Sequence, residues 1–515
     1  MQISIQALRD AVGVTAIVGH NTALEVSSSR GNVPLEGTLT IAGVRTDSRQ
    51  IETGDMFVCI AGDRFDGHDF AADVAARGAV VLLAERDPFV DMSSDARPSV
   101  VVLIVPNAVL ALGKLANWYR HQSKAKVIGI TGTAGKTTVK ELLAHVLSSQ
   151  GTVAKNPLNL NNQIGLPLSM LAASGDEDFW VMEAGISEAR DMDELGAILR
   201  PDFALILNVG QGHTLGLGQR GVAHYKSLLL SYLMDKGSEK GQALVSADYD
   251  DLVREARSQC RNITFFSATG KPLTYRAAYM GVAESGDAVH DNAEDFQDDA
   301  DAMHGRYRVW LDGVAQEIVA PFRGAFGAEN VIAVAAMAHM LGLSGNAIAK
   351  AFTSATLPKQ RFACKRIGSC TIIDDTYNAN PLSMKCMVEA VVEMKVGTPS
   401  AKNSNLTFVL GEMLELGSEA EKAHQDLGRL LATTGASAIY WKGGNAEAVA
   451  SGLRRAGYGG HFAVVEDAAH CLGLMAEHGM PHGHILFKGS RGNRLELFRE
   501  AFEVALSIKA GAGEA

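Results

Sequence analysis

The sequence predicts an α/β protein of three domains, and three observations support this fold class. First, short apolar segments such as "KVIGIT" (126–131) alternate with amphipathic ones, which is typical of parallel strands joined by helices. Second, a glycine-rich turn lies between this strand and the helix that follows it. Third, the alternation starts again near Pro358, and 515 residues exceed what one hydrophobic core usually holds.

Residues 1–106 are expected to form a small α/β domain. Apolar runs at 55–62, 78–85 and 99–106 are predicted as strands. The segment 68–79 is predicted as a helix.

Residues 107–357 are expected to form a central domain with a mostly parallel sheet. A helical segment at 107–124 leads into it. The segment 136–149 is predicted as a helix whose apolar face contains Val139, Leu142, Leu143, Val146 and Leu147. Apolar runs at 178–183 and 202–210 are predicted as the next strands.

Residues 358–515 repeat the scheme and are expected to form a smaller, Rossmann-like C-terminal domain. Each of its predicted strands precedes loop or helical sequence. These strands are 370–375, 406–411, 437–443, 461–466 and 484–489.

The composition argues against several functional classes. Acidic residues outnumber basic ones by 58 to 47 and no basic stripe is visible, so we expect no nucleic-acid partner. No apolar run approaches the roughly 20 residues of a membrane span, and Arg9 and Asp10 stand where a signal peptide would be apolar. Six cysteines without a C-x-x-C pair argue against a disulfide framework or a zinc site. We therefore expect a cytoplasmic protein, with a solvated loop at the acidic run 291–301.

The segment "TGTAGKTT" (131–138) follows a strand and opens a helix, as a phosphate-binding loop does. Backbone N–H groups at a helix start attract anions, Lys136 suits β- and γ-phosphates, and the Thr137 hydroxyl suits Mg²⁺. A glycine-rich turn with an incidental lysine is the alternative, but the order of these residues between strand and helix argues against it. The predicted ATP or GTP site comprises Thr131, Gly132, Thr133, Ala134, Gly135, Lys136, Thr137 and Thr138.

Two further polar residues lie at the carboxyl ends of predicted strands, namely Glu183 and His213. Ligands of open α/β sheets bind beyond the carboxyl ends of the strands. Thr137, Glu183 and His213 are therefore predicted to converge and to hold Mg²⁺, although imidazole is an unusual ligand for that ion. The alternatives are a surface carboxylate and a loop histidine.

Several segments resemble the Mur ligase family, the ATP-dependent amide-forming enzymes of peptidoglycan precursor synthesis. The phosphate loop is similar to the family's T-G-[ST]-[NA]-G-K-[ST]-[ST]. "VRTDSRQ" (44–50) resembles part of a UDP-binding N-terminal domain, "NLNNQIGLPLSML" (159–171) a substrate loop, and "FKGSRGNRLE" (487–496) a segment of the C-terminal domain. The resemblance spans nearly the whole chain and implies the family's three-domain fold.

Two segments of the third domain indicate a branch of this family. "IIDDTYNANPLSM" (372–384) and "LGEMLELG" (410–417) resemble the ligases that add D-alanyl-D-alanine to UDP-N-acetylmuramoyl-tripeptide. The D-N-P-R motif that is usual where diaminopimelate is added as the third residue does not occur here. The resemblance therefore implies a dipeptide as the acceptor.

The resemblance also implies the chemistry. ATP would phosphorylate the tripeptide's terminal carboxylate, and the amine of D-alanyl-D-alanine would attack the acyl phosphate and expel phosphate. Two Mg²⁺ ions are implied, the first at Thr137 and Glu183, the second at His213 and a carbamylated Lys226. The implied catalytic residues are Lys136, Glu183, His213 and Lys226. For Lys226 the alternative is a solvated side chain, which is usual for a lysine beside an apolar helical run.

The remaining implied contacts concern the nucleotide and the two substrates. Asn330, Arg361 and Asp375 match nucleotide contacts of the family, while a helix cap, a surface arginine and a strand-end turn are the alternatives. The implied substrate contacts are Ser48 and Arg49 for the UDP end, Asn161 and Asn162 in the central domain, Asn378 and Asn380 for the dipeptide, and Lys488 and Arg491 for an anion. Each of these also fits an ordinary turn or helix start.

Other functions remain open at this stage. The chain could be a Mur-type ligase that adds a single amino acid, or a folylpolyglutamate synthetase, although the latter lacks a domain like residues 1–106. It could also be a nucleotide-binding regulatory protein without ligase activity, because Ala134, Ser227 and Glu329 depart from the commoner family residues; Glu329 stands where histidine is usual.

We expect a monomer, with a hinge at 357–359 through which the C-terminal domain closes over ATP.

Overall fold

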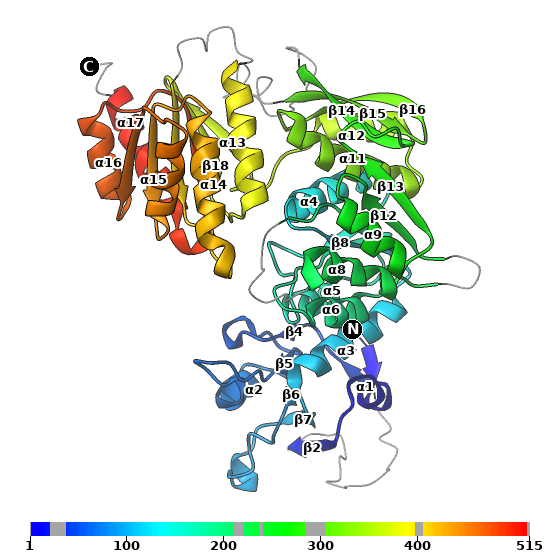
Figure 1. Cartoon of the computed structure of the whole chain (residues 1–515). Coiled ribbons are helices and arrows are strands. Elements are labelled where there is room, and N and C mark those ends of the chain that lie inside the picture. The colour runs from blue at the N-terminus through cyan, green and yellow to red at the C-terminus, as the bar shows by residue number, and fades with distance from the viewer. Residues whose placement is uncertain are drawn as a thin grey trace.

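The computed structural model describes residues 2–20, 38–210, 220–235, 240–283, 304–396 and 405–511. Three α/β regions follow one another along the chain, from blue through green to red in Figure 1. The predicted fold class is confirmed. Two features singled out in the sequence, His213 and the acidic run 291–301, lie outside the described residues.

The N-terminal region contains two sheets. A two-stranded sheet pairs β1 (Gln2–Ser4) with β3 (Thr38–Thr40). A five-stranded sheet has the order β2 (Ala16–His20), β7 (Val100–Ile104), β6 (Val81–Ala84), β5 (Met56–Val58) and β4 (Val44–Arg45). Its strands are parallel except β2. The predicted helix at 68–79 is a 3₁₀ turn, Gly67–Phe70, followed by the short helix α2, Ala71–Ala76.

Helix α3 (Ala108–Gln122) joins this region to the next. It begins where the Asn107 side chain accepts a hydrogen bond from Leu110 N at 2.8 Å. Its Leu112 and Leu115 belong to the N-terminal core with α1 (Ile5–Val12), whereas Ala116 packs in a core of the central region. One helix therefore fixes the two regions to each other.

The central region has a nine-stranded sheet in the order β16, β15, β14, β13, β12, β11, β8, β10, β9. The strands are β8 (Lys126–Thr131), β9 (Val153–Lys155), β10 (Phe179–Glu183), β11 (Phe203–Ile206), β12 (Gln242–Ser246), β13 (Ile263–Ser267), β14 (Tyr275–Val282), β15 (Gly305–Leu311) and β16 (Val314–Ala320). The pairs are parallel from β9 to β14, and β14, β15 and β16 form an antiparallel edge.

Helices cover both faces of this sheet. One face carries α4 (Lys136–Leu147), α11 (Ala325–Met340) and α12 (Gly345–Thr353), and the other α5 (Gly165–Leu171), α6 (Asp191–Leu199), α8 (Gly221–Ser227) and α9 (Asp250–Gln259). The five apolar residues predicted for the face of α4 are fully buried. Helix α11 is apolar on nearly all sides because it lies between α4 and the antiparallel strands.

The C-terminal region has a six-stranded sheet in the order β17, β18, β22, β19, β20, β21. The strands are β17 (Ala363–Ile367), β18 (Cys370–Asp375), β19 (Leu406–Gly411), β20 (Ala438–Lys442), β21 (His461–Val465) and β22 (Gly483–Lys488), and only β17 is antiparallel. One face packs against α13 (Pro381–Val396), α14 (Ala420–Ala432) and α15 (Ala446–Arg455), the other against α16 (Ala468–Glu477) and α17 (Leu495–Gly511). All five predicted strands of this region are present.

Parallel sheets place their functional loops at the carboxyl ends of the strands. In the central region, the segments after β8, β10 and β11 face the segment after β18 of the C-terminal region. This is where the cavity described below lies. In the described parts of the chain, no helix is long and apolar enough to cross a bilayer.

Candidate active site

A cavity of 630 Å³ lies between the central and C-terminal regions. This volume is within the range of small-molecule and cofactor sites. The structure brings to it most of the residues predicted from sequence: Thr133 to Thr138, Asn161, Asn162, Glu183, Asn330, Arg361, Asp375, Asn378, Asn380 and Lys488.

The phosphate loop takes a conformation that requires glycine at one position. Gly135 has φ +80°, and a Cβ atom there would lie 2.6 Å from Asn330 Oδ1. Helix α4 begins at the next residue, so its free backbone N–H groups point at the cavity. Lys136 Nζ donates to Gly132 O at 2.8 Å, and desolvation lowers its pKa. The loop thus has the conformation and the donors of a phosphate site.

Asn208, which follows β11, holds the shape of this loop. Its side-chain oxygen accepts from the backbone N of Thr133 at 3.1 Å and of Ala134 at 2.8 Å. Its Nδ2 donates to Glu329 Oε2 at 2.9 Å. Asn208 was not among the predicted site residues, although it lies near the end of the predicted strand 202–210, much as Glu183 ends the strand 178–183.

Glu183 ends β10 and faces the first turn of α4. Its Oε2 accepts from Thr137 Oγ1 at 2.8 Å, and its Oε1 accepts from Asn161 Nδ2 at 2.7 Å. The buried Asn156 fixes the backbone here, because Glu183 N donates to its Oδ1 at 2.9 Å. A hydroxyl and a carboxylate oxygen at this spacing are the hard donors that Mg²⁺ prefers.

Lys226, in α8, is buried close enough to Lys136 and Glu183 to interact electrostatically with both. Desolvation, followed by the charge of Lys136, lowers the pKa of Lys226 well below its usual value. Among the described residues, no hydrogen bond or ion pair involves its Nζ. A neutral amine is the form that reacts with CO₂, so the environment fits the carbamate implied above. Across the described ranges, no three His, Cys, Asp or Glu side chains gather as metal ligands.

The C-terminal wall of the cavity approaches the phosphate loop through Arg361. Its Nη2 donates to Thr137 Oγ1 at 3.3 Å. Its Cζ lies 4.0 Å from the centre of the Tyr377 ring, a cation–π contact. Tyr377 was not among the predicted site residues, although it stands inside the quoted segment 372–384.

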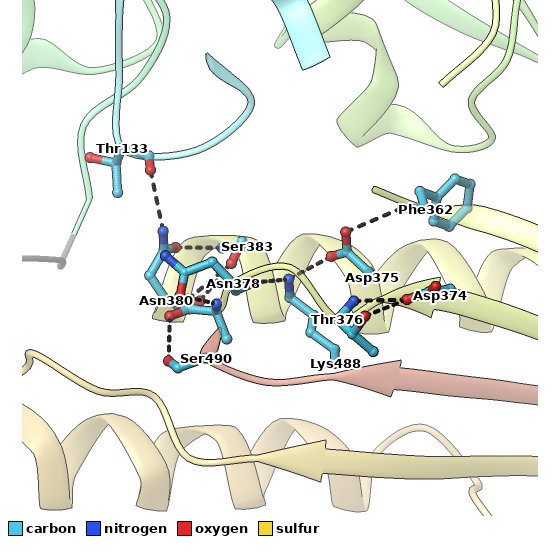
Figure 2. A network of polar contacts seen from close by, with 11 residues as sticks. Thr133, Phe362, Asp374, Asp375, Thr376, Asn378, Asn380, Ser383, Lys488 and Ser490 are labelled. Atoms are coloured by element: carbon cyan, nitrogen blue, oxygen red, sulfur yellow. Dashed lines mark hydrogen bonds and ion pairs between the residues drawn. The ribbon is translucent and has the colours of Figure 1, made fainter. Parts of the chain in front are cut away.

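Asp375 and Lys488 form a buried ion pair in this wall (Figure 2). Lys488 Nζ is 2.5 Å from Asp375 Oδ2 and 2.9 Å from Asn378 O. Asp375 Oδ1 accepts from Phe362 N at 3.2 Å. Asp375 was expected to contact the nucleotide and Lys488 an anion. Both side chains line the cavity, and they are paired with each other.

Asn380 directly precedes α13 and reaches across to the phosphate loop (Figure 2). Its Oδ1 accepts from Ser383 N at 2.9 Å, which caps the helix. Its Nδ2 donates to Thr133 O at 3.2 Å. Asn380 therefore makes a local turn, which was the alternative to a substrate contact, and it also connects the two regions. Asn378 is exposed in the cavity.

A smaller cavity of 200 Å³ adjoins the first one. The two share Asn159, Tyr377, Asn378, Asn380 and Glu415. Arg491 lines only the smaller cavity, with its Cζ 5.4 Å from the centre of the Tyr377 ring. A cationic side chain and a polar lining make this space suitable for a small anionic or zwitterionic group.

Ser48 and Arg49 lie in the N-terminal region, in the 3₁₀ turn Ser48–Gln50, and do not line either cavity. Arg49 is exposed and pairs with Asp47 at 2.7 Å. The hydrogen bond from the Arg49 side chain is the main reason that the pKa of Asp47 falls to about 2. The structure thus leaves this pair apart from the phosphate loop.

Three family models match the chain. They are the Mur ligase middle domain at residues 130–338, the Mur ligase glutamate ligase domain at residues 360–491, and the Mur ligase family catalytic domain at residues 40–120. The matches fall in all three regions of the fold.

The chain is also similar to named proteins over nearly its whole length. It is 30% identical to the UDP-N-acetylmuramoyl-tripeptide–D-alanyl-D-alanine ligase of Escherichia coli, over 90% of this chain and 94% of the relative. It is 28% identical to the ligase of the same name from Bacillus subtilis, over 95% of this chain and 98% of the relative. A crystal structure of MurF from Acinetobacter baumannii superposes with a TM-score of 0.79 at 27% identity, covering 98% of this chain and 99% of that one. A MurF ligase from Thermotoga maritima in complex with ADP gives 0.73 at 25% identity, covering 92% and 99%.

Proposed function

Because the chain belongs to the Mur ligase family, we propose that it is an ATP-dependent, ADP-forming ligase that joins D-alanyl-D-alanine to UDP-N-acetylmuramoyl-tripeptide. The family and the names of its relatives support this reaction. One observation on the molecule itself carries the proposal. Lys136, the Thr137–Glu183 pair and Arg361 converge on one cavity although they come from two regions of the fold. That arrangement suits the transfer of a phosphoryl group between two anions.

The first step forms a bond between an oxygen of the tripeptide's terminal carboxylate and the γ-phosphorus of ATP, and ADP leaves. Lys136 and Arg361 would neutralise the charge that spreads over the transferred group. The N–H groups of the loop would hold the β-phosphate in line. The product is an acyl phosphate whose phosphate is a far better leaving group than hydroxide.

The second step forms the amide. The dipeptide's amine attacks the acyl carbon, the tetrahedral intermediate expels inorganic phosphate, and the amine loses a proton. Asn378 and Arg491, on the two adjoining cavities, are our candidates for holding the dipeptide, with Arg491 at its carboxylate. Approach of the C-terminal region about a hinge at 357–359 would exclude water from the acyl phosphate.

The residues present fit magnesium. Thr137 and Glu183 would hold one ion and a carbamylated Lys226 a second, with His213 lying outside the described residues. When bound, Mg²⁺ supplies positive charge that offsets the charge of the phosphates. Asn161 would keep the Glu183 carboxylate oriented toward Thr137 through its 2.7 Å hydrogen bond.

Carbamylation of Lys226 has a readout that does not depend on activity. Incubation with ¹³C-bicarbonate should give a carbamate resonance in the wild type that is absent in Lys226→Ala. Ligation should also be lost in Lys226→Ala and partly restored by a small added carboxylic acid. Full activity of the unrescued variant would remove Lys226 from the mechanism.

We further propose the boundaries 1–106, 107–357 and 358–515 for the three domains, which agree with the extents of the sheets. Ser48 and Arg49 would bind the UDP end of the substrate, and Asn162, beside the phosphate loop, its peptide end. The free state of all six cysteines is compatible with a cytoplasmic location.

Phosphate release tests the function. The full chain with ATP, Mg²⁺ and UDP-N-acetylmuramoyl-tripeptide should release phosphate at a rate that depends on added D-alanyl-D-alanine. Lys136→Met should lower this release by about 10²–10³-fold, whereas Lys385→Met, which alters an exposed lysine of α13, should leave it unchanged. Nucleotide binding without any acceptor-dependent release would favour the regulatory alternative instead.

A further inference from the structure

Glu329 is a carboxyl group in a cavity that otherwise suits anions. It lies in α11, one residue before Asn330, and lines the cavity together with the phosphate loop. Its Oε2 accepts from Asn208 Nδ2 at 2.9 Å and its Oε1 from Ser246 Oγ at 3.4 Å. None of the mechanistic steps above uses it.

The contact with Asn208 links Glu329 to the phosphate loop. The loop N–H groups of Thr133 and Ala134 are donors, so the oxygen of the Asn208 amide must face them. The amide then presents its two N–H donors on the opposite side, where Glu329 accepts one. Without an acceptor there, Asn208 would leave a donor unpaired and would be free to rotate.

We propose that Glu329 is a positioning residue of the phosphate loop and that it takes up a proton when the nucleotide binds. The proposal rests on the nucleotide site proposed above. It adds a coupling between pH and nucleotide affinity that the ligation reaction does not require.

The groups around Glu329 give the electrostatic reason. Asp248 and Tyr249, which follow β12, and Cys386 of α13 face it, besides Asn208 and Ser246. Burial and, to a lesser extent, Asp248 raise the pKa of Glu329 to about 7, against the lowering effect of the hydrogen bonds from Asn208, Tyr249 and Ser246. The free protein therefore holds a mixture of ionised and neutral carboxyl groups near neutral pH.

The phosphates of a bound nucleotide add negative charge to the same cavity. A nearby negative charge favours the neutral form of a carboxylic acid, so binding should raise the pKa further and draw a proton from solvent. The protonated carboxyl keeps an oxygen that accepts from Asn208, so the loop stays in place. Affinity should then fall as pH rises above about 7, by up to about tenfold for each pH unit by which binding raises the pKa.

Titration calorimetry of the full chain with Mg-ADP tests this without any acceptor. Measured at pH 7.5 in two buffers of different ionisation enthalpy, the wild type should take up more protons per bound ADP than Glu329→Gln, which keeps the shape and an accepting oxygen. Glu421→Gln, at an exposed carboxylate of α14, should behave as the wild type. The titration of ADP itself is common to all three and cancels.

The dependence of affinity on pH completes the test. Between pH 6.5 and 8.5 the wild type should lose more affinity than Glu329→Gln, and Glu329→Leu, which accepts no hydrogen bond, should bind ADP more weakly at both pH values. Equal proton uptake by wild type and Glu329→Gln would overturn the proposal, as would wild-type affinity in a folded Glu329→Leu. Absence of ADP binding in the wild type would instead refute the nucleotide site.

Discussion

The two walls of the cavity are built by different means. The central wall joins the ends of β8, β10 and β11 through hydrogen bonds of 2.8 to 3.1 Å, those of Thr137 with Glu183 and of Asn208 with the loop N–H groups. The C-terminal wall is held by a buried ion pair and a cation–π contact. Two longer hydrogen bonds, of 3.2 and 3.3 Å, connect this wall to the phosphate loop. The central wall is therefore bound together by a local network after neighbouring strands, whereas the C-terminal wall meets the phosphate loop through two contacts between regions.

The largest effect is a loss of stability, expected when the buried ion pair of the C-terminal wall is broken. Lys488→Met leaves Asp375 as an unpaired charge in a buried setting, which typically costs about 3–5 kcal/mol. Urea unfolding should show that loss. The double variant Lys488→Met/Asp375→Asn removes both charges and should recover most of it; a double variant no more stable than the single one would mean that the pair is not the cause.

Removing the cation of the central wall should reduce activity without such a loss of stability. Lys136→Met eliminates the charge that faces the transferred phosphoryl group, and loss of one such group typically lowers kcat by about 10²–10³-fold. The wild-type urea midpoint should be kept, because burying a lysine is itself unfavourable and desolvation lowers its pKa. A normal kcat in this variant would show that Lys136 does not neutralise the transferred group.

A smaller effect is expected at the contact between the walls. Tyr377→Leu removes the ring that supports Arg361, and cation–π contacts are worth about 0.5–2 kcal/mol, or roughly two- to thirty-fold in kcat. Tyr377→Phe keeps the ring and should stay close to the wild type. Comparing kcat in the two variants separates the contribution of the ring from that of the hydroxyl. Equal losses in both would argue against positioning of Arg361 by the ring.

The smallest effect concerns pH. Burial lowers the pKa of His424, His461 and His484, all in the C-terminal region. His424 is neutral in the fold, since its Nε2 accepts from Met413 N at 3.0 Å. A folded pKa below the unfolded value of about 6.5 means that stability is fully present above pH 6.5 and is lost as pH falls below it.

Urea midpoints at pH 7.5 and 5.5 check this sign. The wild type should lose stability at the lower pH, and His424→Gln should lose less than the wild type because one of the three groups no longer titrates. The same pH dependence in both proteins would show that His424 does not contribute to the acid sensitivity.

The two walls also differ in how far they could be predicted. The phosphate loop and α4 follow from one local motif, and Glu183 from its place at the end of a strand, so the central wall could largely be predicted from the sequence. Asn208 occupies an equivalent place, but asparagine after a strand is common and carries no signal until β11 is known to lie beside β8.

The C-terminal wall depends on pairings that no local pattern encodes. Lys488 meets Asp375 only because β22 lies next to β18, 113 residues away in the chain. The contact of Arg361 with Thr137 spans 224 residues and depends on how two regions meet. The family resemblance pointed to these residues as ligand contacts, but their contacts with one another required the structure.

A competition between acceptors in one reaction tests the proposed ligation most directly. The full chain would receive ATP, Mg²⁺ and UDP-N-acetylmuramoyl-tripeptide with equal concentrations of D-alanyl-D-alanine, diaminopimelate, L-lysine, D-glutamate and L-alanine, and the products would be separated by mass. We expect a single product that carries the dipeptide. A product that carries one amino acid, or none, would contradict this expectation.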